Sequence, residues 1–178
     1  PGTHNLKLLS QTIRNLKNNK FPLFLPVFDK VADNKKKYQR KVNKVDLIIL
    51  EGWCVGSKPI DPNYLKKNIN DLEKIEDSNL LWRTAYNKAL VEYQKVFKKF
   101  SYFVFIKIPS WDFVIDWKYK QELGLRSSNS NNHLKKKLYR FIQFYEKLSK
   151  WMYLTSPSDC NVLITLDKKQ TVKKITYK

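Results

Sequence analysis

Apolar residues recur along much of this chain at the three-to-four-residue spacing of a helix. Leu6, Leu9, Ile13 and Leu16 lie on one face at that spacing, which predicts an amphipathic helix over residues 5–18, capped by Thr3 or Asn5. The same spacing predicts further helices that begin at Asp61-Pro62, run over about 79–100, follow Ser110, and cover about 134–152.

Between these helices the pattern changes to strands. Short, continuous apolar runs at 45–50, 102–108 and 162–166 predict strands that are buried on both faces, and residues 171–176 predict a short additional strand. Prolines in the apolar run 21–28 favour an edge strand or an extended segment, and the basic residues 34–44 favour an exposed turn or hairpin. Because strands alternate with helices, the chain is predicted to form an α/β fold with a mostly parallel sheet.

The most informative strand is the run 45–50, which ends at Glu51-Gly52. In open α/β sheets, ligands bind beyond the carboxyl ends of the strands. A carboxylate at that point is suited to hold a metal ion or to contact a reacting hydroxyl. The alternative is a strand that stops at a Glu-Gly turn and has no chemical role.

Length and composition favour a single domain of 178 residues without a membrane span, because no apolar run approaches the roughly 20 residues that a span needs. The chain opens Pro-Gly-Thr-His, without a secretory leader, so we expect a soluble, cytoplasmic protein. Cys54 and Cys160 lie in or beside the predicted strands and are expected to be reduced core residues.

A formal charge of +19 raises the possibility of nucleic-acid binding. The positive charge is almost entirely lysine, however, and it is scattered over the polar sides of the predicted helices. Arginine is better suited to bidentate phosphate recognition. A solvated lysine-rich surface is therefore the favoured interpretation, and a nucleic-acid partner is not expected.

Four short segments in sequence order carry a more specific signal. They are Pro1-Gly2-Thr3-His4, then Phe28-Asp29-Lys30 with Asp33, then Leu50-Glu51-Gly52-Trp53-Cys54-Val55-Gly56, and last Trp82-Arg83 with Asn87 and Tyr93. Together they resemble the P-loop kinases of the D-glycerate 3-kinase type, which are similar to pantothenate kinase, uridine kinase and phosphoribulokinase. The resemblance covers nearly the whole chain, and the Leu-Glu-Gly-Trp-Cys-Val-Gly run is its most specific part.

The resemblance implies a P-loop NTPase-type, three-layer αβα fold that is incomplete at its N-terminus. Such kinases begin with a strand and the loop G-x-x-x-x-G-K-[ST], whose backbone amides bind the nucleotide phosphates. No Gly-Lys-Ser/Thr occurs in this chain. Residues 1–178 are therefore expected to be the C-terminal portion of a single kinase-like domain, with a missing N-terminal part as a partner. A cloned fragment, a split gene and a truncated reading frame all remain open.

The resemblance also implies roles for individual residues. Glu51 would hold Mg²⁺, and Asp29 and Lys30 would act on the substrate side of the cleft, the acid toward a hydroxyl and the amine toward a carboxylate or the transferring phosphate. Thr3, His4 and Asp33 would contact the acceptor substrate. The alternatives are a solvated Asp29–Lys30 pair and a helix-capping role for His4. Asn5 stands where the family usually has Asp, which puts the role of that acid in question.

Two further pairs complete the predicted site. Arg83 and Asn87 are one helical turn apart and would line the acceptor pocket, or Arg83 would instead brace Glu76 or Asp77. Lys118 and Lys120 occupy the helix where these kinases carry lid arginines, and would supply charge toward the ATP phosphates.

The resemblance thus implies an ATP-dependent, Mg²⁺-assisted kinase that phosphorylates a hydroxyl of a small hydroxy acid, with glycerate as the leading acceptor. Two alternatives stay open: a non-catalytic, lysine-rich nucleic-acid-binding domain, and an inactive kinase fragment. Because the P-loop strand of such kinases lies between the strands equivalent to 45–50 and 102–108, the chain alone is expected to be poorly stable or to aggregate.

Overall fold

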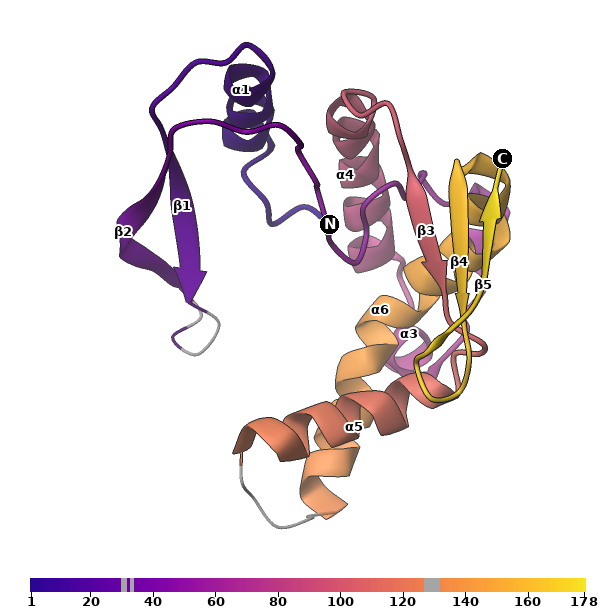
Figure 1. The fold of residues 1–178 in the computed structure, drawn as a ribbon. Helices are drawn as coiled ribbons and strands as arrows, with labels where there is room; N and C mark the ends of the chain where they lie inside the picture. Colours follow the sequence, from indigo (N-terminus) through magenta and orange to yellow (C-terminus); the bar gives the residue numbers. More distant parts are fainter. Residues whose placement is uncertain (30–31, 33, 127–131) are drawn as a thin grey trace.

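The computed structural model describes residues 1–29, 32, 34–126 and 132–178, and Figure 1 shows their arrangement. The chain begins with α1 (Leu6–Lys17), the amphipathic helix that the sequence predicts. Asn5 is its N-cap: the side-chain Oδ1 accepts a hydrogen bond from the backbone N–H of Leu8 at 2.9 Å.

A two-stranded antiparallel hairpin follows, formed by β1 (Leu23–Asp29) and β2 (Asn34–Val42). It confirms the strand predicted from 21–28 and the hairpin predicted from 34–44. The residues of β1 alternate between half-buried and exposed, and β1 contacts α1. Almost every residue of β2 is exposed, which fits its run of lysines. The hairpin shares no hydrogen-bonded strand with the second sheet.

The helix predicted to begin at Asp61-Pro62 is two short helices, α2 (Pro62–Lys66) and α3 (Asp71–Ile75). Asn70 starts the second one, because its side chain accepts a hydrogen bond from the N–H of Glu73 at 3.0 Å. The break rotates the apolar stripe of one continuous helix, and Ile75 at the end of α3 is 74% exposed. The long helix α4 (Leu81–Phe97) then follows as predicted.

The second sheet has the order β3-β4-β5. Strands β3 (Val104–Lys107) and β4 (Val162–Leu166) are the parallel pair that the sequence predicts, and β5 (Val172–Tyr177) adds an antiparallel edge to β4. The connection from β3 to β4 runs through α5 (Phe113–Arg126) and the long helix α6 (Asn132–Asp159). Residues 127–131, between α5 and α6, lie outside the described residues. The predicted mixed α/β fold is confirmed, with a small number of strands among the described residues.

The prediction of a buried strand at 45–50 is wrong for this structure. The segment is extended but carries no strand assignment, and Leu47 and Ile49 are 74% and 78% exposed. A strand is buried on both faces only when neighbouring strands and helices cover it. The part of the chain that the structure describes places no pairing strand beside this segment, so Leu47 and Ile49 stay in solvent and the other apolar side chains are only half-buried.

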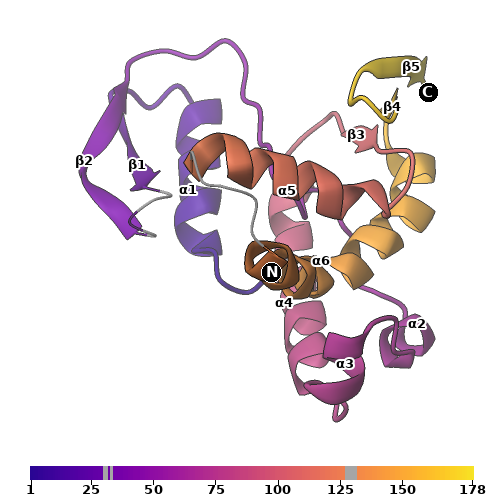
Figure 2. The same ribbon diagram turned by 90° about the horizontal axis from the view of Figure 1, so that it is seen from below.

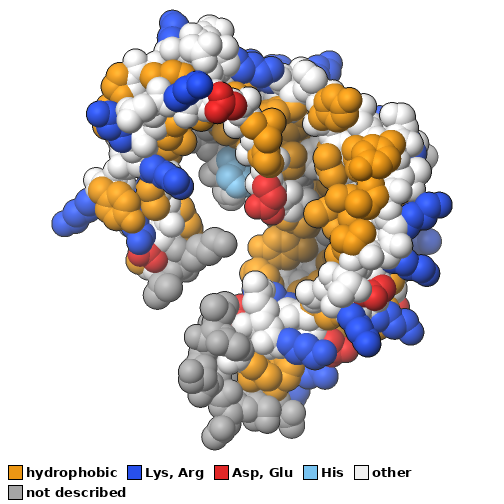
Figure 3. Space-filling model, viewed as in Figure 1, with side chains coloured by type: hydrophobic (Ala, Val, Ile, Leu, Met, Phe, Trp, Pro, Cys, Tyr) orange, Lys and Arg blue, Asp and Glu red, His pale blue; other side chains and the backbone are white. Residues whose placement is uncertain are grey.

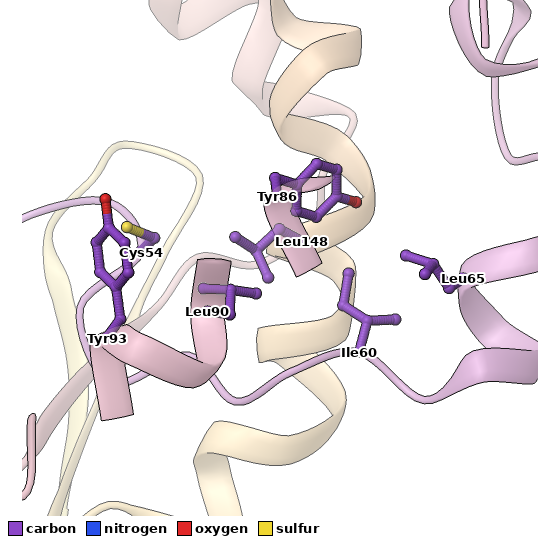
Figure 4. Packing of buried hydrophobic residues seen from close by; sticks show 7 residues of the cluster. All are labelled: Cys54, Ile60, Leu65, Tyr86, Leu90, Tyr93 and Leu148. Atoms are coloured by element: carbon purple, nitrogen blue, oxygen red, sulfur yellow. The ribbon is translucent and has the colours of Figure 1, made fainter. Parts of the chain in front are cut away.

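The core lies where α4, α6 and the segment 54–65 meet. Figure 4 shows its buried apolar cluster, in which α4 contributes Tyr86, Leu90 and Tyr93, and α6 contributes Leu148. Cys54, Ile60 and Leu65 join them from the segment before and within α2. Burial raises the pKa of the Cys54 thiol and of the Tyr86 hydroxyl. Both cysteines are buried and form no disulfide, as predicted.

The molecule is open on one side. The β1–β2 hairpin and the three-stranded sheet lie at opposite sides of the ribbon in Figure 2. The space-filling view in Figure 3 shows a wide hollow between the hairpin and the body that contains α5 and α6, with apolar side chains on its inner surface. None of the helices among the described residues is long and apolar enough to cross a membrane.

Candidate active site

The loop after Glu51 is fastened along one side of α4. Gln94 donates from Nε2 to the carbonyl of Ser57 at 2.6 Å. About two helical turns earlier, Asn87 accepts from the N–H of Ile60 at 2.6 Å and donates to its carbonyl at 3.0 Å. Gly56 adopts a φ of +80°, and a Cβ there would lie 2.4 Å from the ring of Phe103, so glycine is required where the loop turns. These contacts fix the segment that follows the candidate metal-binding carboxylate.

Glu51 itself is exposed, and no group of the described chain hydrogen-bonds to its carboxylate or forms an ion pair with it. Its neighbour Trp53 is held on the opposite side of the loop, where the indole N–H donates to Ser149 Oγ of α6 at 2.8 Å. The Trp53 ring also meets Tyr145 edge-on, with ring centroids 4.6 Å apart. The loop is therefore anchored on both sides while the carboxylate stays free to bind a ligand.

The Pro1–His4 turn is held on α4 as well, by a single phenol. The backbone N–H of Gly2 donates to the hydroxyl of Tyr93 at 3.0 Å, and His4 Nδ1 lies 2.6 Å from the same oxygen. Gly2 has a φ of +100°, a conformation that glycine adopts without strain. Thr3 and His4 are exposed. Because Tyr93 also packs in the cluster with Cys54, the Pro1–His4 turn and the loop after Glu51 meet at one residue.

Asp29 lies at the end of β1, and Figure 1 shows this hairpin well apart from α5 and α6. Its carboxylate lies 3.6 Å from Lys36 Nζ and accepts from the N–H of Ala32 at 3.1 Å. Lys30 and Asp33 fall outside the described residues. Asp29 is thus presented by the hairpin, whereas Glu51 and His4 are presented by the body.

Arg83 is fully buried and directs its guanidinium to protein groups. It donates to Asp77 Oδ2 at 2.7 Å, to the carbonyl of Asp77 at 2.7 Å and to Glu73 Oε2 at 3.3 Å. Glu73 Oε2 also pairs with the buried Lys147 at 3.2 Å, and desolvation lowers the pKa of that lysine. The arrangement matches the bracing alternative for Arg83, with Asp77 as the braced acid. Asn87 is likewise occupied by the backbone of Ile60.

Lys118 and Lys120 lie on α5, as predicted, but differ in surroundings. Lys118 pairs with Glu122 at 2.9 Å and donates to Gln121 at 3.0 Å, and it lines an apolar groove of about 420 Å³ together with Trp53, Phe105, Trp111 and Tyr145. Lys120 is exposed. Of the two, only Lys118 lines the same groove as Trp53, a neighbour of Glu51.

The residues present fit a hydrated Mg²⁺ better than a metal ion held by protein alone. Among the described residues, no three or more His, Cys, Asp or Glu side chains gather into a metal-binding group. Mg²⁺ keeps several waters and is commonly bound through one or two carboxylates together with substrate phosphates. The free carboxylate of Glu51 meets that requirement.

Sequence reasoning did not assign a role to several residues that shape this site. Tyr93 belongs to the fourth segment of the family resemblance but received no role from it, and Gln94 is a polar position beside it. Ser149 and Lys147 on α6 carry no motif. Helical periodicity shows that Tyr93 faces inward, but it does not show which distant groups share its hydroxyl.

Comparisons with known proteins find kinases among the proteins that are similar to this chain. No protein-family model matches the chain. It is 24% identical over 155 residues to the uncharacterized kinase mug58 of Schizosaccharomyces pombe, and 32% identical over 107 residues to the probable ATP-dependent kinase TDA10 of Saccharomyces cerevisiae. These alignments take in 81% and 51% of this chain but 54% and 37% of the relatives, so the chain matches only about half or less of their length.

Two solved structures share the fold over 99% of the chain. One is a D-glycerate 3-kinase from Cryptococcus neoformans var. grubii, with a TM-score of 0.74, 20% identity and 68% of that protein covered. The other is the YGR205w protein, with a TM-score of 0.67, 19% identity and 65% covered. The resemblance deduced from the four sequence segments is thereby confirmed: this chain has the fold of kinases of the D-glycerate 3-kinase type.

Proposed function

We propose that this chain is part of an ATP-dependent kinase that transfers the γ-phosphoryl group to a hydroxyl of a small hydroxy acid, with glycerate as the first candidate. The observation that carries the proposal is the junction at Tyr93, where the Pro1–His4 turn and the loop after Glu51 meet. The two most specific segments of the family resemblance thus converge on one buried residue. The kinase names of the relatives support ATP as phosphate donor.

Phosphoryl transfer depends on positioning and charge neutralisation more than on covalent chemistry. In this proposal Glu51 would hold a hydrated Mg²⁺ ion, and the ion would supply positive charge toward the nucleotide phosphates. Asp29 accepts a hydrogen bond from the hydroxyl of the acceptor substrate. Lys30 neutralises the carboxylate of that substrate. Thr3, His4 and Asp33 orient the acceptor, and Lys118 and Lys120 add charge toward the nucleotide.

The nucleotide site is not complete within these residues. The chain contains no Gly-Lys-Ser/Thr sequence, and Lys118 shares its charge with Glu122. We therefore propose that a P-loop segment outside residues 1–178 completes the site. Arg83 and Asn87 act in this proposal as braces of the acceptor side, since their side chains are directed to Asp77, Glu73 and Ile60.

The test is a kinase assay on the full-length protein that contains residues 1–178, with ATP, Mg²⁺ and a panel of hydroxy acids. We expect ADP formation that depends on the acceptor and is fastest with glycerate. Glu51→Gln should lower kcat by about 10²-fold or more, because it removes a charged ligand needed in the transition state. Glu76→Gln is the matched control, since Glu76 is an exposed carboxylate paired with Arg140.

A near-normal rate for Glu51→Gln would remove Glu51 from the site. Turnover of another alcohol, without turnover of glycerate, would keep the kinase and replace the acceptor. Absence of any ATP-dependent transfer by the full-length protein would overturn the proposed function.

A further inference from the structure

Tyr93 of α4 contacts both segments of the candidate site, the Pro1–His4 turn and the loop after Glu51. It is 4% exposed, and its ring packs beside Cys54, as Figure 4 shows. Its hydroxyl oxygen lies 3.0 Å from the N–H of Gly2 and 2.6 Å from Nδ1 of His4. The His4 ring also meets the Tyr93 ring edge-on, with centroids 5.8 Å apart at 74°.

The hydrogen atoms that these groups can carry determine which of the two donates in the 2.6 Å contact between His4 Nδ1 and the Tyr93 hydroxyl. The Gly2 N–H can only donate, so the phenol oxygen accepts there. If His4 Nδ1 also carried a proton, the phenol would accept twice, and its own proton would have no partner among the described residues. Leaving a buried donor unsatisfied costs about 1–3 kcal/mol. The favoured arrangement has the Tyr93 O–H donating to Nδ1, which leaves the ring proton of neutral His4 on Nε2.

We propose that Tyr93 is a positioning residue that holds neutral His4 in its Nε2–H form. The catalytic role given to His4 and Tyr93 in this inference rests on the proposed function. His4 is exposed, and no described residue hydrogen-bonds to its Nε2. An Nε2–H group donates to an oxygen that carries lone pairs, such as a carboxylate of the acceptor. It does not accept a proton from the reacting hydroxyl, so Asp29 remains the group suited to that contact.

The Nε2–H form of His4 therefore bears on the class of phosphate acceptor that the site would bind. A donor at Nε2, held rigidly through Nδ1, favours an acceptor with an anionic oxygen near its reacting hydroxyl. This matches a small hydroxy acid better than a neutral alcohol or a nucleoside.

The first test is spectroscopic and needs no turnover. In the full-length protein labelled with ¹⁵N, long-range proton–nitrogen correlation spectra at alkaline pH should show His4 with Nε2 protonated and Nδ1 unprotonated. The His4 signals are identified as those that disappear in His4→Gln. In Tyr93→Phe we expect the Nδ1 resonance to move toward that of a histidine exposed to water. A protonated Nδ1 in the unsubstituted protein would overturn the proposal.

The second test is kinetic. Tyr93→Phe should raise the KM for the acceptor by about three- to tenfold, the effect of losing one hydrogen bond, and leave the KM for ATP unchanged. Adding His4→Gln to it should cause no further loss beyond His4→Gln alone, because both changes remove one interaction. Additive losses would mean that Tyr93 acts only through general stability and would contradict the proposal.

Tyr86→Phe serves as the matched control in both tests. Tyr86 is a buried phenol on α4, seven residues before Tyr93, and it packs against Trp82. The Tyr86→Phe substitution should leave the nitrogen signals of His4 and the KM values for the acceptor and for ATP unchanged. If the nitrogen spectra agree but no acceptor is phosphorylated, the arrangement of Tyr93 and His4 stands and the proposed function fails.

Discussion

Arg83, Glu73, Asp77 and Lys147 form a cluster of charged side chains in the interior, each less than a tenth exposed. The cluster joins three elements, because Glu73 belongs to α3, Arg83 to α4 and Lys147 to α6. Lys147 also donates to the carbonyls of Tyr64 and Lys67, at 3.1 and 2.5 Å. Buried ion pairs to Glu73 and hydrogen bonds to backbone carbonyls therefore join α2 and α3 to the core, in addition to the apolar contacts of Leu65 and Leu72.

Removing the Arg83 guanidinium from this cluster should therefore lower the free energy of unfolding. Arg83→Met leaves the carboxylates of Glu73 and Asp77 buried with fewer partners, and we expect a loss of about 3–5 kcal/mol in the free energy of unfolding of the full-length protein. The measurement is the midpoint of urea unfolding. Arg140→Met is the control, since the Arg140–Glu76 pair is about half exposed and should contribute less than about 1 kcal/mol. Equal effects of the two substitutions would show that the buried cluster does not hold these elements together.

The same residues show what sequence can predict at this scale. The Glu-Gly-Trp-Cys and Pro-Gly-Thr-His segments could be identified because their residue types and order are distinctive. The partners of Arg83 could not be predicted, because the helical pattern around an arginine is the same whether it lines a pocket or braces Asp77. Lys147 has the same limitation: nothing in its local sequence separates a buried lysine from a solvated one.

Elements with their own apolar face were predicted well, and those that need distant neighbours were not. Helices α1 and α4 lie where their periodicity places them, and β3 and β4 are the expected parallel pair. The segment 45–50 has an equally strong apolar pattern, yet none of its side chains is buried and Leu47 and Ile49 are exposed. Strand formation requires a partner for the backbone, and periodicity within one segment does not supply it.

Hydrogen exchange can examine this segment directly. In residues 1–178 alone, the amides of 46–50 should exchange rapidly, because no strand of the described chain pairs with them. In the full-length protein we expect them to be protected by a neighbouring strand. The amide of Leu90 in the middle of α4 should be protected in both and serves as the internal reference. Protection of 46–50 in residues 1–178 alone would mean that this segment pairs within the chain.

At the scale of the whole molecule, apolar side chains remain exposed both in the segment 45–50 and on β3. Leu47 and Ile49 face solvent from one segment, and Val104 and Ile106 are 49% and 57% exposed on β3. Strand β3 is an edge of its sheet, so one row of its backbone groups has no strand beside it in the described chain. Exposed apolar edges of this kind favour association with other chains.

We therefore expect residues 1–178, expressed alone, to aggregate or to unfold without a cooperative transition, whereas the full-length protein unfolds cooperatively. Calorimetry and light scattering on the two polypeptides measure the difference. Substituting both Leu47 and Ile49 by glutamate should improve the solubility of residues 1–178, and Leu90→Glu should not, since Leu90 is fully buried. A sharp thermal transition from monomeric residues 1–178 would contradict this expectation.

Trp53 offers a practical consequence of the way its loop is held. Its indole is fixed to Ser149 by a hydrogen bond and remains 41% exposed, two residues after Glu51. With the other four tryptophans replaced by phenylalanine, its fluorescence would be an intrinsic optical signal for events at that carboxylate. Titrations followed by emission would then report ligand arrival without any attached dye.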